Sequence, residues 1–221
     1  MNVTYRGPSD LPEMIPVFPL PGALLLPRGQ MPLNIFEPRY LTMIDDALRH
    51  ARVIGMVQPH FDDGIRQNGA DLCRIGCAGR ITQFAETGDN RYLVSLTGIA
   101  RFRIVEEMDV STPYRQCKVS FEPFVRDFEA RAGEEAVDRA AVIRTLKEFV
   151  EANDLAIDWK GIHAAPNEAL INALSMMAPF GPREKQALLE AEDLKTRADL
   201  LVAITEIELA RRDDGSDAPL Q

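Results

Sequence analysis

Short apolar runs separated by turn-forming residues occupy roughly the first 125 residues of the chain. The runs are rich in β-branched and aromatic residues, which is typical of strands, and they cover residues 15–18, 23–26, 33–36, 53–57, 72–84, 92–96, 102–106 and 117–124. Thr87-Gly88-Asp89-Asn90 and Thr97-Gly98 separate consecutive runs where hairpins need turns. This half is therefore predicted to be a small barrel or folded-over sheet with mainly antiparallel pairing.

One helix is predicted inside this β-rich half. Pro38 suits the first helical turn, and the apolar positions that follow repeat with the spacing of one buried face: Tyr40, Leu41, Ile44, Ala47 and Leu48. Residues 59–69 lack periodicity and collect Asp, Gly and Asn, which predicts an exposed loop. Because exposed loops on rigid strands often carry binding residues, His60 and Phe61 are candidate contact residues.

The periodicity changes to a helical one near residue 126. Residues 134–152 place apolar side chains mainly at three- and four-residue steps, and residues 168–177 repeat the pattern. The Pro and Gly residues at 179–182 end that second helix and start a third. A last helix is predicted to run to about Ala210, with Thr196-x-x-Asp199 as its capping box.

These patterns predict an α+β chain in two parts. Residues 12–125 are expected to form a β-rich subdomain and residues 126–211 a helical one, with residues 1–11 and 212–221 as flexible tails. With 46% apolar and 27% charged residues in 221, the composition is that of an ordinary globular protein.

Charge is distributed unevenly between the two parts. Residues 1–120 carry 13 Lys and Arg against 13 Asp and Glu, whereas residues 121–221 carry 12 against 21 and so hold the whole net charge of −9. Nucleic-acid binding depends on clustered cations, so the second half is not expected to bind phosphates. The first half is neutral overall, so a phosphate-binding patch there stays an open hypothesis. Its candidate residues are Arg74, Arg80, Arg91, Arg101, Arg103 and Arg115.

The three cysteines are too few for a disulfide framework. On one strand, Cys73 and Cys77 would share a face, but a structural zinc site needs four ligands, and we interpret both as small buried hydrophobic residues. The first residues do not resemble a signal peptide, and prolines interrupt the richest apolar run, residues 15–26. We therefore expect a cytoplasmic protein with no membrane span and no metal.

No catalytic constellation stands out. The chain contains no Gly-Lys pair and hence no phosphate-binding loop of the ATPase type, and its serines show no recognisable nucleophile context. The carboxylate pairs are adjacent in sequence, which in extended chain turns the side chains to opposite sides. His60 has no identifiable partner for acid–base work. No catalytic residue and no cofactor are predicted.

Several motifs in a fixed order resemble the N-terminal substrate-binding domain of Lon proteases. They begin with residues 17–21 (VFPLP), an apolar run to Gly29 and residues 31–43 (MPLNIFEPRYLTM). They continue with residues 76–81 (GCAGRI), 92–102 (YLVSLTGIARF), 113–115 (PYR) and 173–191 (ALSMMAPFGPREKQALLEA). The resemblance spans about residues 12–210, and ordered motifs are more specific than any single one.

The resemblance implies a compact PUA-like β pseudo-barrel with one inserted helix, followed by an all-helical subdomain. It also implies a non-enzymatic module that recognises exposed apolar or extended segments of protein or peptide clients, in protein quality control. The chain is expected to lack the ATPase and Ser-Lys protease domains of the full protease. Whether a separate protease or chaperone is a partner remains open. The identity of the client and the oligomeric state are open as well.

Candidate contact residues come from three other places. Phe36, Glu37, Arg39 and Tyr40 surround Pro38; there Phe36 and Tyr40 are interpreted chiefly as a staple between strand and helix, with partner contact as the alternative. Arg101 is likewise interpreted chiefly as a structural residue, with partner contact as the alternative. Met176-Met177 and Phe180 are candidates for an adaptable hydrophobic docking surface, with Met176 and Phe180 as the candidate contact residues, although methionines at helical spacing are more often core residues.

Two further functions stay open. An RNA-binding module is the alternative suggested by the PUA-like fold and the arginines of the β-rich half, although the acidic helical half makes nucleic acid an unfavoured partner. A small-molecule pocket between the barrel and the helices is the third hypothesis.

Overall fold

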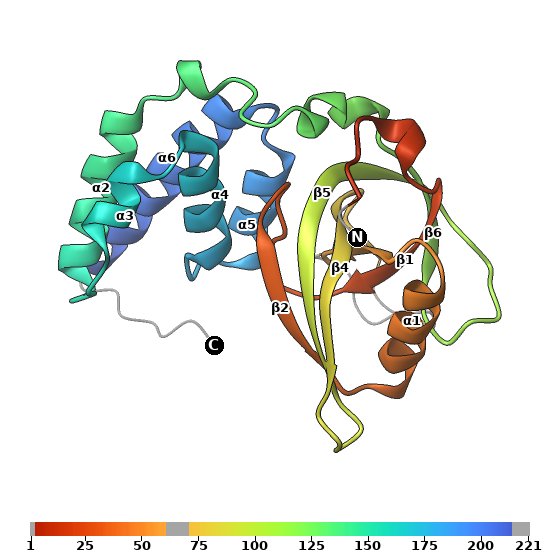
Figure 1. The fold of residues 1–221 in the computed structure, drawn as a ribbon. Coiled ribbons are helices and arrows are strands. Elements are labelled where there is room, and N and C mark those ends of the chain that lie inside the picture. Colours follow the sequence, from red (N-terminus) through yellow and green to blue (C-terminus); the bar gives the residue numbers. More distant parts are fainter. Residues whose placement is uncertain (1–2, 61–70, 214–221) are drawn as a thin grey trace.

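The computed structural model describes residues 3–60 and 71–213, and these residues form a β-rich part and a helical part that lie side by side (Figure 1). The β-rich part has six strands: β1 (Met14–Pro19), β2 (Gln30–Ile35), β3 (Val53–Val57), β4 (Ile75–Glu86), β5 (Tyr92–Glu107) and β6 (Gln116–Ser120). Their order in the sheet is β2-β5-β4-β3-β1-β6, and β5 pairs with β6 as well.

The long strand β5 closes the sheet. One of its edges pairs with β4, while the other pairs first with β2, through residues 92–97, and then with β6, through residues 103–107. Strands β5, β4, β3, β1 and β6 therefore form a closed ring, with β2 attached as an end strand. All pairings are antiparallel except β1 with β3. The predicted mixed α+β fold with a β barrel is confirmed.

Two sequence predictions about this sheet are wrong. Residues 23–26 are not a strand; they are irregular, although Leu24, Leu25 and Leu26 are buried. Thr97-Gly98 does not end a strand, because β5 runs straight through it. At Gly98 the N–H donates to the Gly29 carbonyl at 2.8 Å and the carbonyl accepts from Arg28 N–H at 2.8 Å. Glycine permits this approach, since a Cβ there would overlap the Leu26 carbonyl.

Helix α1 (Pro38–Arg49) connects β2 to β3, as the sequence predicts. Its buried residues are Tyr40, Met43, Ile44 and Ala47. The staple between Phe36 and Tyr40 is wrong: Phe36 is 60% exposed, and the ring that packs edge-on against Tyr40, at 4.3 Å between centroids, belongs to Phe18. Phe18 lies on β1, so a contact distant in sequence anchors the helix.

The helical part contains α2 (Arg139–Ala152), α3 (Trp159–Ala164), α4 (Asn167–Met177), α5 (Pro182–Glu190) and α6 (Leu194–Asp213). Short 3-10 helices flank the barrel or precede α2, at η1 (Pro8–Asp10), η2 (Glu122–Phe128) and η3 (Glu134–Ala136). The single helix expected over 134–152 is broken, because Val137 is extended and the Asp138 carboxylate accepts from Ala141 N–H at 3.0 Å to cap α2. No helix in 3–60 or 71–213 is long and apolar enough to cross a membrane.

The capping box predicted for the last helix also lies elsewhere. Helix α6 begins at Leu194, and the Asp193 carboxylate accepts a hydrogen bond from Thr196 N–H at 2.8 Å. Thr196 is therefore the third helical residue and not the cap. Asp199 instead pairs with Lys195 at 2.5 Å, one turn into the helix.

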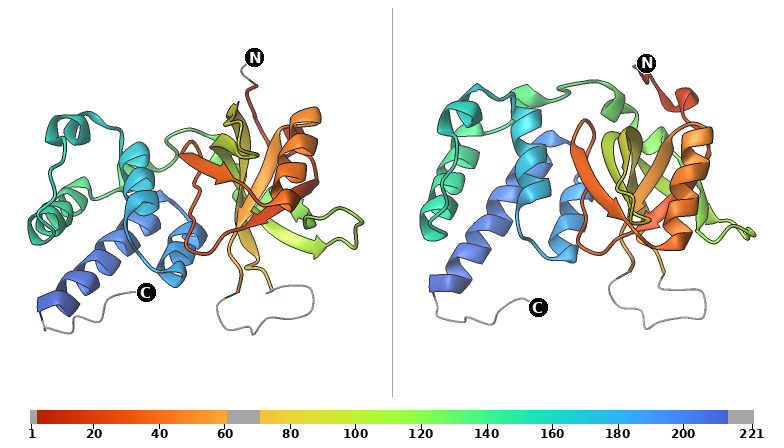
Figure 2. Two further views of the ribbon diagram at one scale, coloured as in Figure 1. Left: turned by 90° about the horizontal axis from the view of Figure 1, so that it is seen from below. Right: turned by 60° about the horizontal axis from the view of Figure 1, so that its bottom comes forward.

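Buried polar contacts join the helical part to the barrel. Gln58 directly follows β3, and its side-chain amide donates to Pro182 O at 3.0 Å and to Gln186 Oε1 at 3.2 Å. Gln186 in turn donates to Ile75 O at 3.1 Å. One apolar core cluster also runs through both parts, from Leu24 and Ile35 of the barrel side to Leu188 of α5. Helices α4 and α5 are thus held against the barrel at the side of β2 (Figure 2).

Candidate functional site

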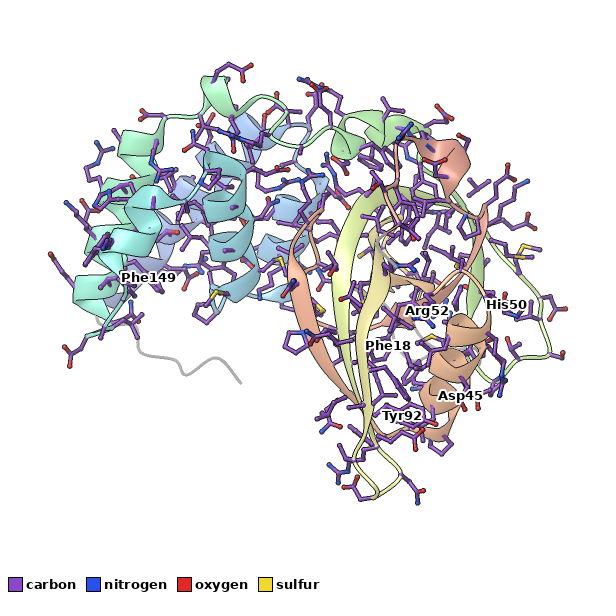
Figure 3. The ribbon with its side chains drawn as sticks, in the orientation of Figure 1. Phe18, Asp45, His50, Arg52, Tyr92 and Phe149 are labelled. Atoms are coloured by element: carbon purple, nitrogen blue, oxygen red, sulfur yellow. The ribbon has the colours of Figure 1, made fainter. Side chains whose placement is uncertain are left out.

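An apolar groove lies between helices α2, α4 and α6. Its volume is about 210 Å³, and the walls are almost entirely apolar side chains: Val142, Leu146, Phe149, Val150, Leu155, Ile157, Leu174, Met177, Ala178, Pro179, Phe180, Leu201 and Val202, with Thr145 and Thr205. Figure 3 shows Phe149 near the outer end of α2, on the side of the molecule away from the barrel. The groove is wide enough for an apolar side chain.

The helical periodicity of α2 builds one wall of this groove. Positions 142, 145, 146, 149 and 150 fall on one face at steps of three and four residues. Thr145 interrupts the apolar face, and its buried hydroxyl has no hydrogen-bond partner among the described residues.

A second groove, of about 540 Å³, separates the start of β2 from α4. Gln30, Met31 and Pro32 line the β2 side, and the α4 side is lined by Ala169, Asn172, Ala173, Met176 and Met177. An ion pair between Arg28 and Glu168 lies on the lining.

Met177 lines both grooves and is 82% exposed. A single exposed apolar side chain is ordinary, but one that continues the apolar lining of a groove extends a contiguous apolar patch, and such patches mark interaction sites. Methionine is flexible and polarizable, which suits contact with varied apolar partners. We call the two groove linings together the Met177 surface.

The residues predicted around the α1 corner lie apart from this surface. Tyr40 is buried, which raises the pKa of its phenol, and it is not available to a partner. Phe36 is exposed, with the Arg91 guanidinium 5.9 Å from its ring centroid, and Glu37 pairs with Arg39 at 2.8 Å. Figures 1 and 2 show α1 on the side of the barrel away from the helical part.

Arg101 is not a contact residue, because it is 4% exposed and its donors are used inside the chain. Its backbone N–H and Nε both donate to Asp127 Oδ2 at 2.9 Å, and Nη2 donates to Oδ1 at 2.8 Å. The remaining Nη1 reaches the carbonyls of Leu189 and Ala191 at the end of α5. Arg101 therefore ties the barrel to the helical part.

Of the remaining candidates, Met176 and Phe180 belong to the Met177 surface. Met176 is half-buried against Gly29, and Phe180 is buried in the wall of the first groove. His60 is exposed elsewhere, where its N–H donates to Asp71 O at 2.6 Å. Phe61 lies outside the described residues.

Sequence reasoning named Met177 with Met176 and Phe180 as a docking surface but did not include it among the candidate contact residues, and it did not select Phe149 as a contact residue. The adjacent methionines at the end of α4, just before Pro179, were the available signal, since neighbouring residues of a helix point about 100° apart and only one of them can face the core squarely.

The three cysteines are free and buried. Cys73 precedes β4, so it does not share a strand with Cys77 as expected. Burial strongly raises the pKa of the Cys77 thiol and raises that of Cys117 to about 11, so both are neutral at pH 7. Within 3–60 and 71–213, no group of three or more His, Cys, Asp or Glu side chains is placed to hold a metal ion.

Comparisons of the sequence and of the structure with known proteins both lead to Lon proteases. The chain is 28% identical over 205 residues to Lon protease 2 of Myxococcus xanthus and 27% identical over 201 residues to a Lon protease of Anaeromyxobacter dehalogenans. These matches cover 89% of this chain but only 24% and 23% of the two relatives, so the chain spans about a quarter of their length.

Two solved structures share the fold. A Lon N-terminal domain protein from Xanthomonas campestris has a TM-score of 0.60 at 20% identity, covering 86% of this chain and 97% of that one. The N-terminal domain of the Mycobacterium avium complex Lon protease has a TM-score of 0.63 at 17% identity, covering 87% and 98%. The model of the ATP-dependent protease La (LON) substrate-binding domain matches residues 14–206, and the chain belongs to this substrate-binding family.

Proposed function

We propose that the chain is a non-catalytic recognition module that binds apolar segments of protein clients on the Met177 surface. The observation that carries the proposal is the exposed Met177 side chain at the junction of the apolar first groove and the partly polar second groove, in a member of a substrate-binding family. Transfer of clients to a separate protease or chaperone, a role in quality control and a cytoplasmic location belong to the same proposal.

The groove chemistry favours apolar side chains over charged ones. A charged group entering the first groove would lose water without gaining an ion-pair partner, because the described lining contains no charged residue. An apolar side chain would gain about 25 cal/mol for each Å² removed from water. Single contacts of this kind are weak, so a client must present several apolar residues together.

Titration of a reduced, carboxymethylated and permanently unfolded protein into Met177→Asp tests the proposal. We expect the variant to bind at least tenfold more weakly than the parent, because the aspartate places a charge between the two grooves. Val125→Asp is the matched control, since Val125 is also an exposed aliphatic residue, at 47%, but lines neither groove. Equal affinity of the parent and Met177→Asp would contradict the proposal.

The RNA-binding alternative is not favoured by the arginines expected to support it. Arg101 is buried, Arg115 pairs with Glu107 at 2.5 Å, and Arg91 pairs with Asp89 at 3.3 Å. These three guanidiniums do not form one phosphate-binding track.

A further inference from the structure

A separate concave pocket on the barrel collects arginines and hydroxyl groups. It has a volume of about 460 Å³, and its polar lining comes from Tyr5, Arg28, Arg52, Arg80, Thr82 and Thr97. This volume falls within the range of roughly 300–1,000 Å³ that small-molecule sites occupy. The pocket has no lining residue in common with the first groove, and it shares Arg28 and Ala130 with the second.

Strand pairing brings Arg52 and Arg80 together. Arg80 on β4 lies opposite Val53, the first residue of β3, and Ile81 N–H donates to Arg52 O at 2.8 Å. The Arg80 guanidinium folds over the same turn, where its Nη1 donates to Ala51 O at 3.2 Å. Figure 3 shows Arg52 beside the end of α1.

The positive charge of these two side chains is not balanced inside the pocket. Arg80 contacts only neutral acceptors, through Nη1 to Tyr5 Oη at 2.9 Å and to Ala51 O, so its Nε and Nη2 donors have no partner among the described residues. The Arg52 guanidinium likewise has no hydrogen-bond or ion-pair partner in the described chain. Asp127, the one carboxylate on the described lining, gives both oxygens to Arg101.

The backbone adds a second observation. Arg52 has a φ of 58°, in the left-handed region that Gly and Asn occupy at the least cost. Its N–H donates to Ala47 O at 2.9 Å, so this conformation belongs to the turn that ends α1 and leads into β3. Arg28, on the same pocket, is also left-handed at 64°, but its charge is paired with Glu168.

We propose that this pocket binds a small organic phosphate, with the phosphoryl group held by Arg52 and Arg80. The free Nε and Nη2 donors of Arg80 are the pair that a guanidinium uses to bind a phosphate side-on, and Arg52 supplies the second charge. The Thr82 hydroxyl donates to Ser95 O at 3.2 Å and lies 3.0 Å from the Thr97 hydroxyl, so these two groups make the wall polar while the arginines supply the donors. Phe128 and Tyr5 supply aromatic surface for the organic part of the ligand.

Isothermal titration with adenosine monophosphate, inorganic phosphate and adenosine, each alone, tests this site. We expect saturable one-to-one binding of the monophosphate, weaker binding of inorganic phosphate and no binding of adenosine. Affinity should fall at least tenfold in Arg52→Gln and in Arg80→Gln, and it should fall with added salt. Arg103→Gln, which removes an exposed arginine on the same sheet outside the pocket, should bind like the parent.

Arg52→Gln is the decisive variant, because the Arg52 side chain makes no hydrogen bond or ion pair in the described chain and its loss should leave the melting temperature unchanged. Arg80→Gln also removes the contacts to Tyr5 and Ala51, so its melting temperature is measured alongside. Unchanged affinity in Arg52→Gln, or equal loss in Arg103→Gln, would overturn the proposal. So would binding of a single-stranded RNA oligonucleotide with a steep salt dependence but of neither small phosphate, since that result indicates a polyanion surface.

Discussion

At the scale of single residues, the strongest constraint is the buried pair of Arg101 and Asp127. Each side chain is less than a tenth exposed, and two hydrogen bonds from the Arg101 guanidinium and one from the Arg101 backbone N–H satisfy both carboxylate oxygens. A buried pair of this kind adds little net stability over apolar residues, but losing one partner leaves an uncompensated charge. The pair instead fixes the end of α5 against the barrel, because it orients the Arg101 guanidinium toward the carbonyls of Leu189 and Ala191.

Asp127→Asn tests this constraint. We expect the free energy of unfolding to fall by about 3–5 kcal/mol, because the Arg101 guanidinium stays buried without a counter-charge. Equilibrium urea unfolding measures the change. Asp199→Asn removes the exposed partner of Lys195 and is the control, expected to leave the urea midpoint nearly unchanged because solvent screens this pair. A similar small loss in both variants would show that Arg101 finds another partner or reaches water.

Asp193 makes a pH-dependent contribution at the start of α6. The hydrogen bond from Thr196 N–H, which stabilises the ionised carboxylate, lowers the pKa of Asp193. A folded-state pKa below the unfolded value adds stability above the unfolded pKa, near 4, and this stability disappears as the pH falls through the folded pKa.

Asp193→Ala should therefore destabilise the chain by about 1 kcal/mol at pH 7, through loss of the cap. The deficit relative to the parent should shrink below about pH 4, where the parent also loses the ionised cap. Thermal unfolding of both proteins between pH 3 and pH 7 gives the difference at each pH. A deficit independent of pH would mean that the carboxylate charge plays no part.

At the scale of elements, β5 decides the shape of the barrel. It has 16 residues, enough to pair with β4 along one edge and with both β2 and β6 along the other. Gly98 lies between the two pairing regions, where the chain around Leu26 crosses close to the strand. The absence of a side chain at this position is what allows β5 to continue.

Gly98→Ala should lower the free energy of unfolding by on the order of 1–3 kcal/mol, because the added Cβ meets a backbone carbonyl and not a flexible side chain. Differential scanning calorimetry would record the loss as a drop in melting temperature. Gly7→Ala is a matched control, since a Cβ there has no neighbour within 4 Å. Equal melting temperatures for the two variants would contradict the claim that the close approach of the chain around Leu26 requires glycine at position 98.

At the scale of the whole molecule, the barrel and the helical part are coupled through Gln58, Gln186 and the Arg101–Asp127 pair. The shared apolar core adds to this coupling. The second groove depends on it directly, because one wall is β2 and the other is α4. A partner on the Met177 surface would thus contact both parts of the chain.

The coupling predicts one cooperative unfolding transition. Fluorescence of Trp159, the only tryptophan, reports on the helical part, and thiol labelling of buried Cys77 reports on the barrel. We expect the two transitions to coincide in the parent chain. They should separate in the Gln58→Ala, Gln186→Ala double variant, because the polar bridge is lost. Separate transitions in the parent would indicate independent parts.

The sequence by itself determined the family, the strands bounded by turn residues, helix α1 and the helices α4 and α5, because local periodicity and Pro or Gly signals specify these elements. It did not determine the continuity of β5 past Gly98 or the burial of Arg101, which depend on residues far along the chain at 26–29 and 127. For the Met177 surface, too, the sequence alone did not decide which residue is exposed. The two methionines at the end of α4 are visible in the sequence, but only the packing of α4 between β2 and α6 decided that Met177 is the one left exposed.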